Sequence, residues 1–169
     1  MVDTAISNGA RALLESTSHI PIAQLTPLLA APSTRSVKAI ITLTWPYTSA
    51  TGSVAFLLVE PDFRLRRTRG QVRVQFSGSS AKAIAKAGIA SGDEVILNLA
   101  GVEWVEDETP FATPGRGVEF ELKFTERLLL QVSSRKAAKD AFINFCDAVS
   151  ARRFPGHKSN RYRPSNART

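Results

Sequence analysis

The chain is divided into short β-type runs with one Ala- and Lys-rich helix among them, and this order restricts the fold more than any other feature. Strands are predicted at residues 37–45, 53–59 and 71–76, and further strands within 89–99 and 118–132, the last being one strand or a pair. Several of these runs alternate apolar with polar side chains, the period of a strand with one covered face. The helix, residues 81–87, lies between the third and fourth strands and stops at Gly88.

Strand, strand, strand, helix, strand, strand is the order of the OB fold, a small five-stranded barrel. We therefore predict a mainly β domain at residues 36–132, with its helix between strands 3 and 4. At 169 residues, with 43% hydrophobic content, the chain suits one such domain with frayed ends.

The segments on either side of the barrel are predicted from their composition and spacing. Prolines break residues 1–35, so we expect an extended lead-in packed on the barrel, with a short helix around residues 9–15. The apolar spacing of Ala138, Phe142, Phe145 and Val149 predicts a C-terminal helix within residues 133–153. Residues 154–169 are typical of a basic disordered tail.

Cysteine usage and apolar runs indicate where the protein works. The single cysteine, Cys146, excludes an internal disulfide and favours a reducing compartment. The first residues lack the basic-then-apolar pattern of a signal peptide, and the strongest apolar run, residues 54–59, is too short to span a bilayer. We therefore expect a protein that is not exported and has no membrane partner.

The net charge of +7 is concentrated in two stretches of the chain. Residues 64–73 carry five arginines and residues 152–169 carry six basic residues with no acid, so the two stretches hold 11 of the 22 Lys and Arg. The remaining chain has 11 basic against 15 acidic residues, a balance of −4. Localised positive charge indicates an anionic partner that is met at particular places.

The arginines of the first stretch lie on and beside the third predicted strand, and no acid follows Asp62 there. Guanidinium groups bind phosphates and stack on flat rings, so arginines near aromatic residues favour single-stranded nucleic acid. The OB fold usually binds over strands 2 and 3 and the loops after strands 1 and 4, which is where these arginines fall. The alternative is a solvated surface hairpin.

Three motifs occur in the order and spacing of a known family. They are Trp45-Pro46-Tyr47 after the first strand, Val-Arg-Val-Gln-Phe-Ser-Gly at residues 72–78, and Gly-Asp-Glu-Val-Ile at residues 92–96. Over residues 36–132 they resemble the first OB domain of telomere end-binding proteins, the protection-of-telomeres and ciliate α-subunit group, and mainly its filamentous-fungal members. The resemblance implies a nuclear protein that binds the single-stranded G-rich overhang at chromosome ends and works with other telomere-complex proteins. It also places stacking aromatics at Trp45 or Tyr47 and at Phe76.

Ten residues are candidates for contact with the nucleic acid. Arginines would neutralise phosphates, aromatic rings would stack on bases, and the outward side chains of the third strand would read base edges. These residues are Trp45, Tyr47, Thr48, Arg64, Arg66, Arg67, Arg69, Arg73, Gln75 and Phe76. Alternation groups Trp45 with Ile41 and Leu43, and Phe76 with the core side of its strand, so core packing is the competing interpretation for both rings.

Other function classes stay open. Glu103, Glu106, Asp107 and Glu108 lie near Trp104, where carboxylates would repel phosphates, so this edge could instead face a protein or steer the strand to one side. A protein-interaction module would dock through residues 106–117 and the C-terminal helix. A general single-stranded DNA- or RNA-binding OB protein is the third possibility.

Catalytic motifs are weak. His19 and His157 show no metal spacing with Cys146, and residues 115–117 lack the Lys-Ser/Thr of a phosphate loop. The carboxylates at residues 106–108 could hold a divalent ion, although a solvated acidic loop is the commoner explanation. We expect no enzymatic activity, no cofactor and no small-molecule substrate.

Overall fold

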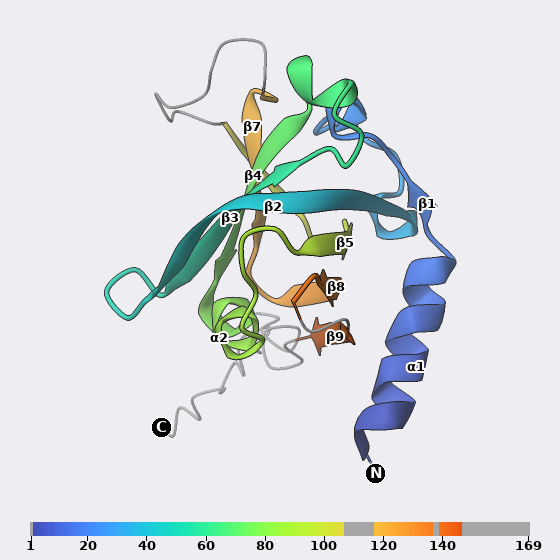
Figure 1. Ribbon diagram of the computed structural model, residues 1–169, viewed down its shortest axis with the longest axis vertical. Helices are drawn as coiled ribbons and strands as arrows, with labels where there is room; N and C mark the ends of the chain where they lie inside the picture. The colour runs from blue at the N-terminus through green and yellow to red at the C-terminus, as the bar shows by residue number, and fades with distance from the viewer. Residues whose placement is uncertain (1, 107–116, 137–138, 147–169) are drawn as a thin grey trace, which may run out of the picture.

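The computed structural model describes residues 2–106, 117–136 and 139–146. In these ranges the protein is mainly β, with nine strands, two α-helices and three short 3₁₀ turns (Figure 1). The helices are α1 (Val2–Glu15) and α2 (Gly78–Lys86), and the 3₁₀ turns are η1 (Ile22–Gln24), η2 (Pro32–Thr34) and η3 (Leu65–Arg67). The strands are β1 (Ser18–His19), β2 (Arg35–Thr48), β3 (Ser53–Val59), β4 (Gln71–Ser77), β5 (Glu94–Asn98), β6 (Glu103–Glu106), β7 (Phe120–Phe124), β8 (Arg127–Ser134) and β9 (Lys139–Cys146).

All nine strands belong to one curled sheet. Its order is β6-β7-β4-β3-β2-β5-β8-β9, and β1 pairs with β2 beside this path. The β4–β7 and β1–β2 pairs are parallel and the others are antiparallel. Strand β7 lies near one end of this order and β8 near the other, yet only Thr125 and Glu126 separate them in the chain. The two ends of the sheet are therefore brought together around the core. The arrangement is OB-like, with α2 between β4 and β5 as the sequence predicts.

Helix α2 covers one end of the curl. Gly78, its first residue, and Gly88, just past its end, have φ angles of 60° and 64°, a left-handed conformation that favours glycine. Ala81 and Ile84 are buried beneath the helix. The hydroxyl of Ser80 donates to the Thr125 carbonyl at 2.7 Å, so α2 is tied to the bend between β7 and β8.

The core is continuous through the curl. Phe76 of β4 packs edge-on against Phe56 of β3 and stacks on Phe124 of β7, with ring centroids 5.9 and 5.7 Å apart. Ile22 and Leu25 of the N-terminal segment are also buried in this cluster. The Ile22 backbone N–H donates to the buried Glu60 carboxylate, which fastens this segment to the end of β3.

Three fold predictions need correction. The described chain has nine strands instead of five: β1, β6 and β9 are added, and of the two alternatives for residues 118–132 the structure has the pair, β7 and β8. The lead-in, residues 1–35, is not mainly extended, because α1 occupies residues 2–15 and packs Ala10 and Leu14 against Leu129 of β8.

The predicted C-terminal helix is the third correction, because residues 139–146 form strand β9. All eight residues of β9 pair with β8, and Phe142 packs toward α1 while Ile143 packs on the core. A short run that is apolar on both faces is compatible with a helix or with a strand covered on both faces. Here the hydrogen bonding to β8 makes it a strand. Of that predicted segment, residues 133–134 belong to β8, whereas residues 137–138 and 147–153, like the basic tail at 154–169, lie outside the described residues.

Candidate nucleic-acid interface

The outer face of β2, β3 and β4 exposes a tryptophan because β2 contains a bulge. Ile41 pairs with Leu58 and Leu43 pairs with Leu57, so Thr42 is an extra residue and the side chains after it change face. Ile41 is fully buried, whereas Leu43 and Trp45 are 52% and 41% exposed. The alternation that grouped Trp45 with Ile41 on the core side is therefore wrong.

Trp45 reaches across β3 to meet Arg73 of β4. Trp45 of β2 pairs with Ala55 of β3, and Ala55 pairs with Gln75 of β4. In this row only the small Ala55 side chain lies between β2 and β4. The guanidinium carbon of Arg73 lies 4.9 Å from the centroid of the Trp45 ring. A cation over an indole is a favourable contact, and it holds the ring in place while part of it still faces solvent.

Arg73 also pairs with a carboxylate. Its Nη1 lies 3.3 Å from Oε2 of Glu121 on β7, and both side chains are largely buried. Arg73 Nε and Glu121 Oε2 have no hydrogen-bond partner among the described residues. In the next row of the sheet, Lys123 pairs with Gln75 on one side and Glu103 on the other. The face therefore carries charges of both signs around one exposed ring.

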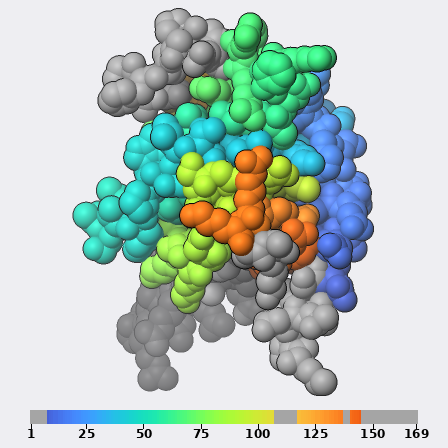
Figure 2. All heavy atoms as spheres, viewed as in Figure 1, coloured from blue at the N-terminus to red at the C-terminus, as the bar shows by residue number. Residues whose placement is uncertain are grey.

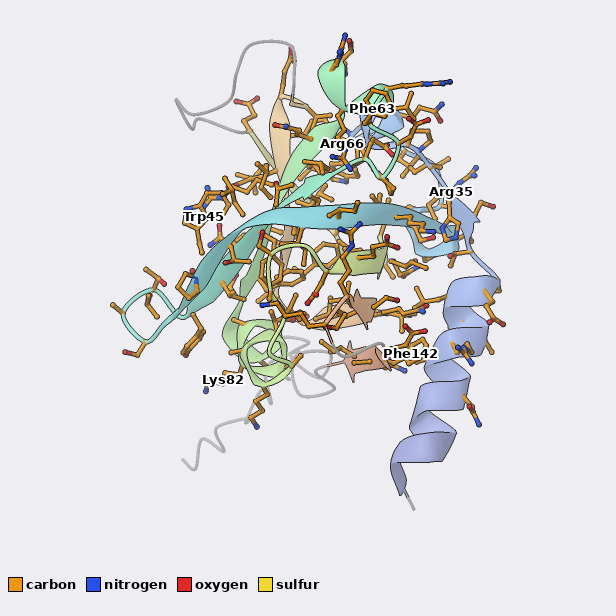
Figure 3. The ribbon with its side chains drawn as sticks, in the orientation of Figure 1. Arg35, Trp45, Phe63, Arg66, Lys82 and Phe142 are labelled. Carbon is orange, nitrogen blue, oxygen red and sulfur yellow. The ribbon has the colours of Figure 1, made fainter. Side chains whose placement is uncertain are left out.

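The other four predicted arginines lie on the β3–β4 connection and not on the strand face. Arg66 is used structurally: its Nε donates to the Glu60 carbonyl at 2.5 Å and its Nη2 donates to the Pro61 carbonyl at 3.2 Å. Arg64 and Arg67 are exposed, and Arg69 is half-buried. This connection and the β2–β3 turn lie at opposite ends of β3 (Figures 1 and 2), and Trp45 is well separated from Arg66 in Figure 3. The arginine cluster is thus divided between two places.

The remaining predicted contacts behave differently from one another. Tyr47 is half-buried against the core, and Thr48 bonds within the β2–β3 turn, where its Oγ1 lies 2.5 Å from Oγ1 of Thr51. Gln75 is half-buried on the outer face beside Arg73. Phe76 is only 1% exposed, so its prediction as a stacking platform is wrong: β4 alternates regularly there and directs the ring into the core.

A hollow of about 690 Å³ lies beside the β3–β4 connection, which contributes Arg69 to its lining. It is lined by residues 25–27 and 104–106, and by Arg69, Glu119 and Phe120. The Trp104 and Phe120 rings meet edge to face, with centroids 5.0 Å apart. The hollow therefore has an aromatic wall, one cation and two carboxylates.

Sequence reasoning missed several residues that matter here. Glu121 and Lys123 were detectable, because they alternate with the core residues Phe120, Leu122 and Phe124. The exposure of Leu43 could not be detected, since a bulge leaves no signal in the alternation of apolar and polar residues. The hollow was also undetectable, because its lining comes from distant parts of the chain.

Within the described ranges, no cluster of three or more His, Cys, Asp and Glu side chains is placed to hold a metal ion. None of the described helices is long and apolar enough to cross a membrane. The acidic residues Asp107 and Glu108, and the glycine motif apart from Gly117, lie outside the described part of the chain.

The strand order and the Trp45–Arg73 face define an OB-like β domain with an exposed aromatic and cationic surface. Residues 15–141 match the family described as "Domain of unknown function (DUF8502)", and the chain belongs to this family. No curated protein sequence gives a significant match.

One solved structure is similar to the chain, that of fission yeast Pot1 with single-stranded DNA. Its TM-score is 0.43 and its sequence identity is 16%, over 77% of this chain and 40% of that one. The matched part of this chain thus corresponds to less than half of the length of that protein. At these values the similarity identifies no ligand for this chain.

Proposed function

We propose that this domain binds single-stranded nucleic acid across the outer face of β2, β3 and β4. The observation that carries the proposal is the exposed Trp45 ring beneath the Arg73 guanidinium, 4.9 Å from it. An exposed indole stacks on any base, because every base has a π-face. The strand-2 and strand-3 face of an OB fold is also the surface on which such domains bind oligonucleotides.

The exposed arginines of the β3–β4 connection support the same function. Arg64 and Arg67 form no ion pair with any described residue, so their charges are available to phosphates. Arg73 differs, since Glu121 neutralises much of its charge and its main role is to position the indole. Stacking therefore occurs on the strand face, and phosphate contact occurs at the turn.

We infer further that the strand is the G-rich single strand of chromosome ends, bound in the nucleus as part of a capping complex, with no catalytic step. This inference is supported by the three motifs around Trp45, residues 72–78 and residues 92–96, whose order resembles telomere end-binding proteins. It makes a specific demand: a G-rich repeat must bind more tightly than other single strands of the same length.

A protein-docking function is the second candidate, and the composition of the outer face favours it. Leu43 is exposed beside Trp45, and the Arg73–Glu121 pair leaves little net charge between the strands. Such a surface, apolar with paired charges, also suits a protein partner. Both candidate functions would fail only if Trp45 contacts neither a nucleic acid nor a protein.

The test is a titration of the full chain with fluorescent 12-nucleotide strands: a G-rich telomeric repeat, a polypyrimidine and an RNA of the G-rich sequence. Lithium salts prevent folding of the G-rich strand. Trp45→Ala should weaken binding roughly 5- to 150-fold, because stacking on one base is worth about 1–3 kcal/mol. Trp45→Phe should retain most of the affinity.

Leu13→Ala is the matched control, since Leu13 is an exposed apolar residue on α1, away from β2–β4. Equal affinity of wild type and Trp45→Ala would exclude this face. Equal affinity for all three strands would exclude the telomeric role and retain general single-strand binding. Absence of binding to any strand would leave protein docking as the function of the face.

A further inference from the structure

The hollow beside β6 is separate from the Trp45 face and has its own chemistry. In its aromatic wall the Trp104 ring meets the buried Phe120 ring edge to face, at an interplanar angle of 78°. The volume of about 690 Å³ lies within the range of small-molecule pockets and exceeds that of one nucleobase. The wall can therefore support a flat ring.

Three charged side chains of the described residues line the hollow. Arg69 lines it together with Glu106 and Glu119, and none of the three forms an ion pair with any described residue. The cation and the carboxylates thus lie apart in one hollow, each available to a ligand.

The backbone fixes the origin of the Arg69 side chain. Arg69 has a φ of 51°, and a Cβ on the next residue, Gly70, would collide with the backbone of Leu65 and Arg66. The Gly70 carbonyl accepts a hydrogen bond of 3.0 Å from the Glu60 N–H. This tight connection holds the Arg69 backbone at the rim of the hollow.

The mixture of charges selects the class of ligand. Two carboxylates would repel a phosphate, and Arg69 would repel a lysine or arginine side chain of a peptide. A neutral ring with donors on one edge and acceptors on another satisfies both signs. Guanine fits best, because its N7 and O6 form an acceptor pair for a guanidinium, while N1–H and the N2 amino group form a donor pair for a carboxylate.

We propose that the hollow is a pocket for one guanine base, which stacks on Trp104, accepts hydrogen bonds from Arg69 and donates to Glu106 or Glu119. The proposal rests on the proposed function, since it supplies the base preference of the bound strand. It assigns Glu106 of β6 and Glu119, which precedes β7, a role in base recognition. For the acidic edge around Trp104 the sequence predicted repulsion of phosphate, and left open contact with a protein or steering of the strand. Stacking at Trp45 and guanine recognition at Trp104 are then separate steps.

The chain has two tryptophans, so two indole N–H signals in a ¹H–¹⁵N spectrum report the two surfaces separately. The full chain is titrated with dGMP, dAMP, dCMP and dTMP, which share the same phosphate. We expect dGMP to shift the Trp104 signal at about tenfold lower concentration than the other three. dIMP, which lacks the N2 amino group, and 7-deaza-dGMP, which lacks N7, should each lose most of that preference.

Variants test the two edges. Arg69→Asn removes the guanidinium and places at this position a residue that tolerates the left-handed conformation. It should abolish the preference for dGMP over dAMP, as should the double change Glu106→Gln with Glu119→Gln. Lys82→Asn removes one charge from α2, which in Figure 3 lies far from Arg66 on the β3–β4 connection, and should leave the preference unchanged. Dispersion of the backbone amide signals shows whether each variant is folded, and the base analogues need no variant at all.

The proposal would be overturned if the Trp104 signal responded equally to all four nucleotides, or if it responded to none of them. So would a Lys-rich peptide that shifts Trp104 while dGMP does not, a result that would assign the hollow to a protein partner. Failure of the Trp45 face would give a different result. Trp45→Ala would then bind single strands as wild type does, while the Trp104 signal would still respond to dGMP.

Discussion

At position 45 an indole reaches solvent because Thr42 is an extra residue in β2, whereas at position 76 regular alternation keeps a phenyl ring in the core. For both rings the sequence leaves base stacking and core packing open. One bulge decides the first case and its absence decides the second. The side-chain types at the two positions carry no such information.

The assignment of Phe76 to the core leads to a stability prediction. Phe76→Ala should lower the free energy of unfolding by about 3–5 kcal/mol, since it removes contacts with Phe56 and Phe124. Phe76→Leu should cost less and should bind single strands as wild type does. Chemical denaturation and strand titration of the same samples check both. A Phe76→Leu protein of wild-type stability that binds poorly would return this ring to the interface.

At the scale of elements, the β3–β4 connection shows that one arginine-rich stretch contains two kinds of arginine. Arg66 donates to two backbone carbonyls and so shapes the turn, while Arg64 and Arg67 stay exposed. A combined charge reversal of Arg66, Arg67 and Arg69 would therefore disturb the fold as well as the charge. Single changes are needed to separate the two effects.

Replacement of Arg66 by methionine should destabilise the protein by about 1–3 kcal/mol, because the Glu60 and Pro61 carbonyls lose their donors. Arg67→Met, one residue away and exposed, should change stability by no more than about 0.5 kcal/mol. The two free energies of unfolding are compared by denaturant titration. Equal values would show that the Arg66 hydrogen bonds contribute nothing to the turn.

Strand β9 and helix α1 form a second element-level unit. Leu14 and Ala10 of α1 pack on Leu129 of β8, and the Arg11 guanidinium lies 5.6 Å from the Phe142 ring centroid. Arg11 also approaches Asp140 of β9, with 3.9 Å between Nη2 and Oδ2. These contacts cover the outer face of β8 and β9, so the proposed nucleic-acid surface is restricted to the other half of the sheet.

For the whole molecule, the division of the arginines limits how many phosphates the described surface neutralises. Arg66 is bound to carbonyls and Arg73 to Glu121, which leaves Arg64 and Arg67 as the exposed cations of the predicted cluster. Single-strand affinity falls with salt by about 0.7 log units per log unit of salt for each phosphate contacted. The contribution of the cluster is therefore smaller than five arginines would suggest.

A double variant, Arg64→Gln with Arg67→Gln, should reduce the slope of log affinity against log salt by about 1.4. Lys82→Gln with Lys86→Gln on α2 removes the same charge from the other end of the molecule and should leave the slope unchanged. Titrations at several lithium chloride concentrations give both slopes. An unchanged slope in the arginine variant would place the strand away from the β3–β4 connection.

The order of strands and the position of α2 could be predicted because alternation, glycine stops and Ala-rich spacing are local properties of residues such as Val74, Gly88 and Ile84. Four features could not be predicted: the exposure of Trp45, the pairing of Arg73 with Glu121, the strand at 139–146 and the hollow around Trp104. Each depends on a bulge, a register or a contact between segments far apart in the chain, and these follow from the lowest free energy of the whole packed sheet.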